Sequence, residues 1–210
     1  MGTTEVSNNS SAAREFWNWF QVNHTQFLFL TEVDEAEKQR LLDDFLTQLH
    51  HYCPHLFFAI GGDPAGKPEL IISAEGNRDY FKDVEDLMSI APTLKDWTLI
   101  AFKPAQGFDF KLQYGDILFD PSDLWFLPMV SKSNQKFFGL RIGFNHFDES
   151  RRKAFLNGSY LMIDNALGER QAGLDVHHID VCRLPEDPAE KGFIELRELK
   201  EYLDWWRMQG

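Results

Sequence analysis

Several features that would place a protein in a familiar class are scarce in this sequence. Its 210 residues include only two cysteines, Cys53 and Cys182, which excludes a framework of disulfide bridges. No apolar run is long enough to cross a bilayer, and the first residues lack the basic start and apolar core of a secretory signal. We therefore expect a cytoplasmic protein with reduced thiols and no membrane partner.

Positive charge is also in short supply. Twenty-one Lys and Arg stand against thirty-three Asp and Glu, which gives a formal net charge of −12. Such a charge opposes attraction to phosphate backbones, so we expect no nucleic-acid partner. The bases are concentrated between residues 131 and 160, where six of them stand against two acids. This basic segment is either a solvated surface or a contact for an acidic partner.

Familiar catalytic and cofactor motifs are absent from the sequence. It contains no G-x-S-x-G, H-E-x-x-H or G-x-G-x-x-G pattern. The glycines of GGDPAGKP, residues 61–68, lead to Lys-Pro rather than to the Lys-Ser or Lys-Thr of a phosphate-binding loop, so this segment is predicted to be a turn. The sequence therefore predicts no cofactor and favours a protein that is not an enzyme.

Apolar residues make up 43% of the chain, and they predict an order of elements that occurs twice. Strand, turn, strand, helix and strand are predicted over residues 55–104 and again over 124–184, with a hairpin around Gly115 between them. A hairpin followed by a crossover helix gives a mixed sheet. We expect an α+β fold with helices at both termini packed on this sheet, whether the two β-β-α-β units are a duplication or a coincidence.

Length and composition predict how the chain is divided. Residues 1–12 are small and polar and are expected to form a flexible tail. The remaining residues, 13–210, contain no Pro-, Gly- or Ser-rich linker and are expected to form a single α+β domain. Within it, Asp34 is predicted to cap a helix that ends before Pro54.

Polar groups near the end of the predicted helix over 148–167 are candidates for chemistry. This helix is apolar on nearly every face, so Asp164 needs either a partner or a place at the solvated rim. Gly168 is predicted to end the helix and to place Glu169 just beyond it. With His178 on the following strand, these carboxylates are candidate catalytic groups in a cleft between the repeated units.

The strand that ends the second unit is predicted to place His178, Asp180 and Cys182 on one face. These residue types ligate metals or form a thiol with its base. Structural zinc sites have two close Cys/His pairs with regular spacing, and this strand does not, so no metal is expected.

Aromatic residues are abundant, with nineteen Phe, six Trp and five Tyr. The helices near the two chain ends carry Trp17 and Trp205, which exceed what one buried stripe can hide, and exposed Trp side chains anchor interfaces. The alternative is that both terminal helices pack on the domain. The candidate partner-binding residues are Trp17 and Trp205 together with the consecutive cations Arg151, Arg152 and Lys153.

Three segments carry a resemblance to known sequences. They are PELIISAEGNRDYF (68–81), GFDFKLQYGDILFDPSDLWFLPM (107–129) and LMIDNALGE (161–169). They are similar to uncharacterised bacterial proteins grouped as domains of unknown function, over most of residues 55–185. The resemblance implies a bacterial, cytoplasmic origin and transfers no catalytic residue.

The sequence thus favours a non-catalytic protein-interaction or self-associating module, with a homo-oligomer among the expected states. The alternative is a small-molecule-binding protein or hydrolase-type enzyme that uses the predicted cleft.

Overall fold

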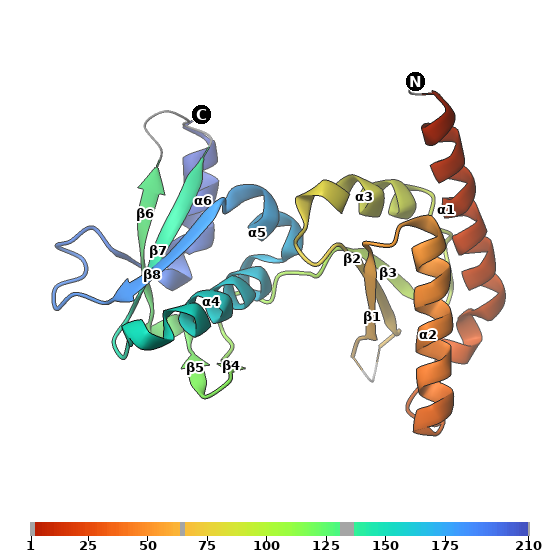
Figure 1. The fold of residues 1–210 in the computed structure, drawn as a ribbon, viewed down its shortest axis with the longest axis horizontal. Helices are drawn as coiled ribbons and strands as arrows, with labels where there is room; N and C mark the ends of the chain where they lie inside the picture. The colour runs from red at the N-terminus through yellow and green to blue at the C-terminus, as the bar shows by residue number, and fades with distance from the viewer. Residues whose placement is uncertain (1–2, 64–65, 131–136, 210) are drawn as a thin grey trace. The chain divides into compact units, whose positions relative to one another are not determined.

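The protein is described from a computed structural model, which covers residues 3–63, 66–130 and 137–209 (Figure 1). The fold is α+β with helices at both termini, as predicted. By their contacts the residues form two compact units, Met1–Lys103 and Pro104–Gly210, whereas the sequence predicts one domain over 13–210. Each unit has a hydrophobic cluster made of its own residues, and each is described by itself.

The first unit opens with α1 (Thr3–Asn23), the 3₁₀ turn η1 (His24–Phe27) and α2 (Glu35–Tyr52). Helix α1 begins inside the segment predicted as a flexible tail, because a helix anchored by packing from Ala13 onward adds further turns at little cost. Helix α2 begins as predicted, with the Asp34 carboxylate accepting a hydrogen bond from the Glu37 N–H at 2.9 Å. It ends at Tyr52, and Cys53, the residue before Pro54, is already extended.

A three-stranded sheet, sheet 1, follows in the order β1-β2-β3. Its elements are β1 (Phe57–Gly61), β2 (Glu69–Ser73), η2 (Arg78–Tyr80), α3 (Phe81–Ser89) and β3 (Thr98–Ala101). Strands β1 and β2 are antiparallel, and β3 returns parallel to β2 after α3, as predicted. Leu70 and Ile72 of β2 are fully buried in the cluster that α1, α2 and α3 also form, so one face of the sheet holds the core.

Aromatic rings fill the first core, and Phe45 of α2 lies at their centre. Its side chain is fully buried. The ring centroids around it, at 4.0 to 5.8 Å, belong to Phe16, Trp19, Phe20, Phe27 and Phe58. Tilted and edge-to-face contacts at these distances stabilise a core beyond the area they bury.

Trp17 belongs to this core, which corrects its prediction as a partner-binding residue. Its side chain is 2% exposed, and its indole N–H donates to the Leu87 carbonyl at 2.8 Å. The carbonyl comes from α3, which is seventy residues further along the chain. The pattern of α1 alone cannot indicate that a second helix covers this side.

Trp17 and Trp97 allow the strength of this buried hydrogen bond to be measured. Trp97 is also buried, but its indole N–H finds no acceptor among the residues that the structure describes. Both Trp→Phe replacements remove the same atoms. The difference between their effects on the free energy of unfolding therefore reports the hydrogen bond from Trp17 to Leu87. We expect Trp17→Phe to lower the free energy of unfolding by about 1–2 kcal/mol more than Trp97→Phe. Urea denaturation measures both values, and equal losses would contradict the assigned bond.

The second unit begins with the predicted hairpin, β4 (Leu112–Tyr114) and β5 (Ile117–Phe119), which turns at Gly115 with a positive φ. A four-stranded sheet, sheet 2, follows in the order β8-β7-β6-β9. Its strands are β6 (Trp125–Val130), β7 (Phe138–Phe144), β8 (His178–Arg183) and β9 (Ile194–Glu195). Its helices are η3 (Pro121–Asp123), η4 (Glu149–Arg151), α4 (Arg152–Leu167), α5 (Glu169–Asp175), η5 (Leu196–Glu198) and α6 (Leu199–Arg207).

The two units share the predicted strand directions. In sheet 2, β6 and β7 are antiparallel, and β8 is parallel to β7 after the crossover helices. The predicted turn at 131–136 lies outside the described residues, as do residues 64 and 65 of the turn at 61–68. Gly168, with φ 79°, ends α4 as predicted, but the chain then forms α5, so β8 starts only at His178 rather than at Leu174.

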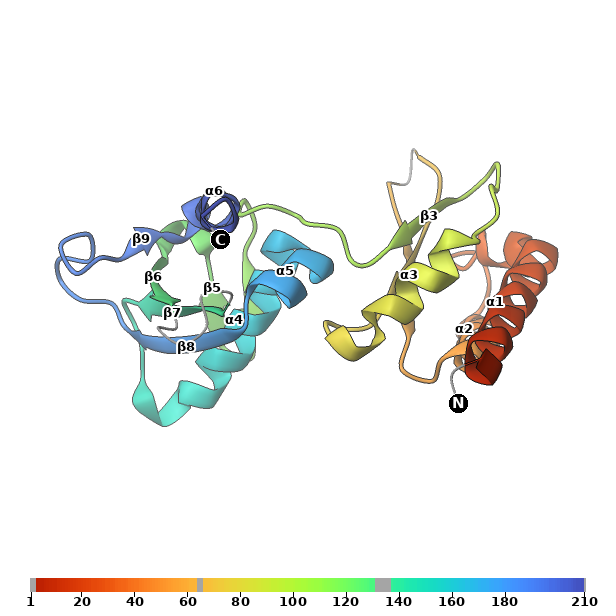
Figure 2. The ribbon, with the colours of Figure 1, turned by 90° about the horizontal axis from the view of Figure 1, so that it is seen from above.

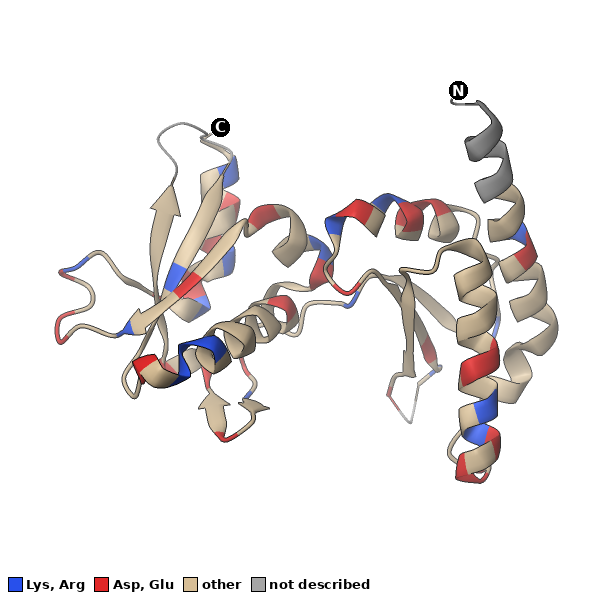
Figure 3. Ribbon diagram, in the orientation of Figure 1, with Lys and Arg blue, Asp and Glu red and all other residues tan. Residues whose placement is uncertain are grey.

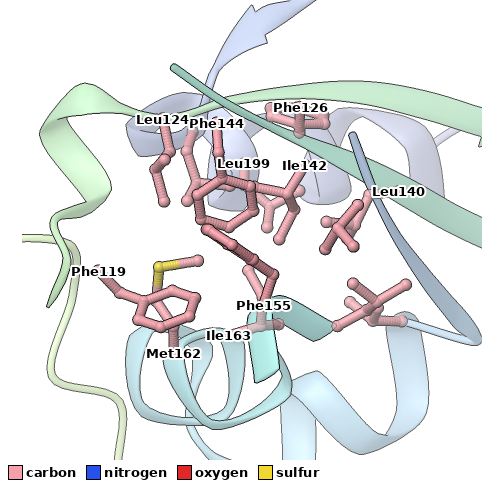
Figure 4. Packing of buried hydrophobic residues seen from close by; sticks show 14 of the residues in the cluster. Phe119, Leu124, Phe126, Leu140, Ile142, Phe144, Phe155, Met162, Ile163 and Leu199 are labelled. Atoms are coloured by element: carbon pink, nitrogen blue, oxygen red, sulfur yellow. The ribbon is translucent and has the colours of Figure 1, made fainter. Parts of the chain in front are cut away.

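The helices of the second unit pack on one face of sheet 2. Figure 2 looks roughly along its strands and shows α4 and α6 on the same side. Figure 4 shows the side chains between them, where Phe126, Ile142 and Phe144 of the sheet meet Phe155 of α4 and other buried residues. This side of the sheet is the core of the unit, and no described helix of the second unit covers the other side.

Candidate functional site

The uncovered face of sheet 2 brings together several candidate residues. Side chains of a strand alternate between the two faces, and the pairing register aligns Leu127 of β6 with Arg141 of β7 and Asp180 of β8. The residues on this side define what we call the open face. They are Trp125, Leu127, Met129, Gly139, Arg141, Gly143, His178, Asp180, Cys182 and, opposite Trp125 on β9, Glu195.

An apolar row occupies one side of the open face. Trp125, Leu127 and Met129 are each partly exposed, because no described helix of the second unit packs on them. The segment after β8 covers part of the face, since a Cβ at Gly143 would lie 2.5 Å from Leu184 and a Cβ at Gly192 would lie 3.5 Å from Leu127. Sequence reasoning missed this row: residues 124–130 were predicted as a strand, but no role was assigned to the alternate side chains at 125, 127 and 129.

Asp180 is held by three donors from different elements. The Arg141 Nε donates to its Oδ2 at 2.7 Å, and both Arg152, at the start of α4, and the backbone N–H of Val181 (at 2.9 Å) donate to its Oδ1. Partial burial raises the pKa of Asp180, but the hydrogen bonds from Arg141 and Val181 and the guanidinium charges of Arg141 and Arg152 together outweigh it. The net effect is a pKa below the usual value, so the carboxylate is ionised at neutral pH.

The free edges of sheet 2 are blocked by Asp180 on one side and by Pro128 on the other. Strand β8 is an edge strand, and the carboxylate of Asp180 takes up the neighbouring N–H of Val181. On the other side, β9 pairs only with Trp125 and Phe126, and further along β6 stands Pro128, which has no N–H to offer. Side-chain plugs and edge prolines are the devices by which proteins prevent strand addition.

The interaction of Asp180 with the two arginines predicts a pH-dependent contribution to stability. We expect Asp180→Asn to lower the free energy of unfolding by about 1 kcal/mol at pH 7. A carboxyl whose pKa is depressed on folding stabilises above its unfolded-state value and loses this contribution as pH falls through the folded-state value. The difference in stability between the two proteins should therefore begin to shrink as pH falls below about 4, and should vanish once pH lies below the lowered pKa of Asp180.

Asp116 supplies the matched control for that pH series. It pairs with Arg151 but its side chain is 81% exposed, so we expect no measurable change for Asp116→Asn. Chemical denaturation at several pH values measures both variants. A loss for Asp180→Asn that persists unchanged at low pH would show that the ion pairs are not its cause.

Two of the three consecutive cations predicted to bind a partner are engaged within the unit. Arg151 pairs with Asp116. Arg152 pairs with Glu149 and Asp180, and its guanidinium lies 5.8 Å from the ring centre of Phe147. Lys153 is exposed and pairs with no carboxylate in the described part of the chain. Figure 3 shows acidic residues beside the basic start of α4, so the local positive charge is largely compensated.

Trp205 is exposed as expected, with 49% of its surface accessible, and its ring lies 5.4 Å from that of Tyr202. The adjacent Trp206 packs on Phe138 at 5.3 Å instead. A role of Trp205 in binding a partner stays a prediction.

The three candidate catalytic residues lie in different surroundings. Asp164 is half-buried on α4, which packs against the core face of sheet 2. Glu169 is fully buried in the first turn of α5, where a negative charge suits a helix start. His178 is exposed at the beginning of β8, on the open face. The cleft predicted between the repeated units stays a prediction.

His178, Asp180 and Cys182 share one face of β8, as the alternation predicts. Within the described ranges no three His, Cys, Asp or Glu side chains are placed to hold a metal ion. Asp180 is committed to its arginines, and burial raises the pKa of the Cys182 thiol, which lies beside a shallow cavity of about 330 Å³ lined also by Phe147 and Arg183. A protonated thiol is a poor nucleophile, so this arrangement supports neither metal nor thiol chemistry.

No known protein family, curated protein or solved structure matches this chain. The resemblance to uncharacterised bacterial proteins therefore stays a prediction. None of the helices in the described ranges has the length and apolar composition needed to cross a membrane.

Proposed function

We propose that the protein is a non-catalytic interaction module whose open face on sheet 2 binds a partner protein. The observation that carries the proposal is the apolar row Trp125, Leu127 and Met129 beside Arg141, on a sheet face that no described helix of the second unit covers. Because the free edges of this sheet are blocked, a partner would bind to the face rather than add a strand.

The charges on the open face indicate the chemistry of the partner. The Arg141 side chain is 42% exposed, whereas that of its partner Asp180 is 20% exposed, so this pair presents mainly its guanidinium to solvent. Glu195, at the Trp125 end of the row, is paired with Arg197. The chain as a whole carries a net charge of −12, so surfaces other than the one around Arg141 would repel an acidic protein. We propose a protein partner that places apolar side chains on the row and a carboxylate on Arg141.

The alternative of a small-molecule-binding protein or hydrolase has less support. Asp164 and Glu169 belong to helices on the core side of sheet 2, and His178 belongs to the open face. Catalytic groups must come within hydrogen-bond reach of one substrate, and nothing in these positions favours such a substrate.

Site-specific photocrosslinking in the native host tests the proposal. A photoreactive amino acid in place of Met129 should give a discrete adduct with another protein, and the same group at exposed Gln113 of β4 should not. Adding Arg141→Glu should reduce the adduct at least about tenfold, because one buried charge contact contributes at least that factor to affinity. Arg40→Glu is the control, since Arg40 belongs to the first unit, is exposed and pairs with Glu37 and Asp44 at 2.6 Å.

Two outcomes would overturn the proposal. One is the absence of any adduct that depends on the Met129 position, and the other is an adduct that Arg141→Glu leaves unchanged. Arg141→Gln, which removes the charge but retains a hydrogen-bond donor, keeps the test valid if the Glu variant fails to fold. Circular dichroism establishes which variants are folded.

A further inference from the structure

Strand β1 of sheet 1 is an edge strand, and no described residue of the first unit pairs with its free side. Its sequence, FFAIG, contains no charged residue and no proline. In the order β1-β2-β3 only one side of β1 is paired, and within the described residues no hydrogen bond reaches its backbone from any segment other than β2. Its outward N–H and C=O groups are therefore free to pair with another strand.

This edge differs from those of sheet 2 in the same chain. There the Asp180 carboxylate and Pro128 block the free edges, whereas β1 has neither device. An apolar, uncharged edge strand without protection is a template for pairing with a further chain. Edge protection by a charged side chain or a proline therefore occurs in sheet 2 of this chain and is missing from β1.

We propose that β1 pairs with β1 of a second copy of this chain, antiparallel and with Ala59 on the two-fold axis. An isologous contact requires a self-complementary surface, and this register provides one. Phe58 lies opposite Ile60 of the second copy, an aromatic and β-branched pair that favours antiparallel sheets. Phe57 lies opposite Gly61 of the second copy, where the aromatic ring covers the bare glycine backbone.

Charge and exposure agree with this occupant. Two chains that each carry −12 repel, so their contact requires a surface without ionisable groups, which β1 supplies. Phe57 is 42% exposed, and pairing would cover part of its ring. Five residues on each side bury less than the roughly 1,200 Å² typical of stable complexes, so we expect a reversible dimer with a dissociation constant on the order of micromolar. The proposal concerns a different surface from the open face and does not depend on it.

Sedimentation velocity on the full chain tests the association. The wild type should convert from monomer to dimer as its concentration rises through the micromolar range. Ala59→Lys places two like charges on the axis and should weaken the dimer at least about tenfold. Thr98→Lys is the matched control, because it adds a lysine to the same face of sheet 1 on β3, away from the β1 edge, and should leave the dimer unchanged.

Disulfide trapping tests the register. In a Cys182→Ser background, Ala59→Cys should form a dimer under mild oxidation, because directly opposite residues of an antiparallel pair approach within bonding geometry. Phe57→Cys should not form this dimer, because the cysteine lies opposite Gly61 of the second copy, four residues along the strand from the second cysteine. A wild type that stays monomeric at every concentration, a dimer unaffected by Ala59→Lys, or equal trapping of both cysteine variants would overturn the proposal.

Discussion

Replacing Gly158 with alanine is expected to lower the free energy of unfolding of the second unit by about 3 kcal/mol. A Cβ at this position would lie 2.2 Å from a ring carbon of Phe119, far inside contact distance. The ring is fully buried, with Phe144 and Phe155 at 5.6 and 6.3 Å, so it has no space into which to move. The clash outweighs the gain of up to about 1 kcal/mol that alanine brings to a helix interior. Urea denaturation measures the loss.

Two further variants make this measurement specific. Gly61→Ala should cost little, because no atom lies within 4 Å of a Cβ there and its φ is not positive. Adding Phe119→Leu to Gly158→Ala should recover part of the loss, so the two substitutions would not be additive. Strict additivity would show that the Gly158 backbone and the Phe119 ring are not the interacting pair.

Phe45→Ala should produce a comparable loss, about 4 kcal/mol, confined to the first unit. The truncation removes a ring that contacts five other aromatic rings, and all of these rings belong to residues before Lys103. Amide hydrogen exchange measured by mass spectrometry should therefore show faster exchange in α1, α2 and sheet 1, with protection in sheet 2 retained.

Phe29→Ala is the control for that experiment, because this ring is exposed and its loss should change little. Equal loss of protection in both units would mean that residues 13–210 unfold together, as expected of a single domain. A loss restricted to residues before Lys103 would establish two cooperative units.

Features governed by neighbouring residues were predictable from the sequence. Asp34 caps the start of α2 and Pro54 follows its end. Gly115 forms the turn of the β4–β5 hairpin, and Gly168 ends α4. All four were predictable because capping and positive φ depend on the local sequence. Helix α5 was not predicted, because at seven residues it is too short to show a helical period, and the alternation that begins at Leu174 resembles a strand.

Features that depend on distant contacts were not predictable. The alternation correctly placed Asp180 with its two neighbours on one face of β8, but its partners Arg141 and Arg152 are 39 and 28 residues away. Arg152 reaches Asp180 because β8 is an edge strand, a property of the sheet order rather than of any local pattern. Trp17 was misplaced for the same reason, since the helix that covers it comes much later in the chain.

The six tryptophans are divided equally between the two units, which gives the chain a built-in optical reporter for each. Trp17, Trp19 and Trp97 lie in the first unit, where Trp17 and Trp97 are buried among apolar rings. Trp125, Trp205 and Trp206 lie in the second, where all three retain contact with solvent. Indole emission shifts to longer wavelength in water, so the first unit emits at shorter wavelength, and its unfolding can be followed in the presence of the second.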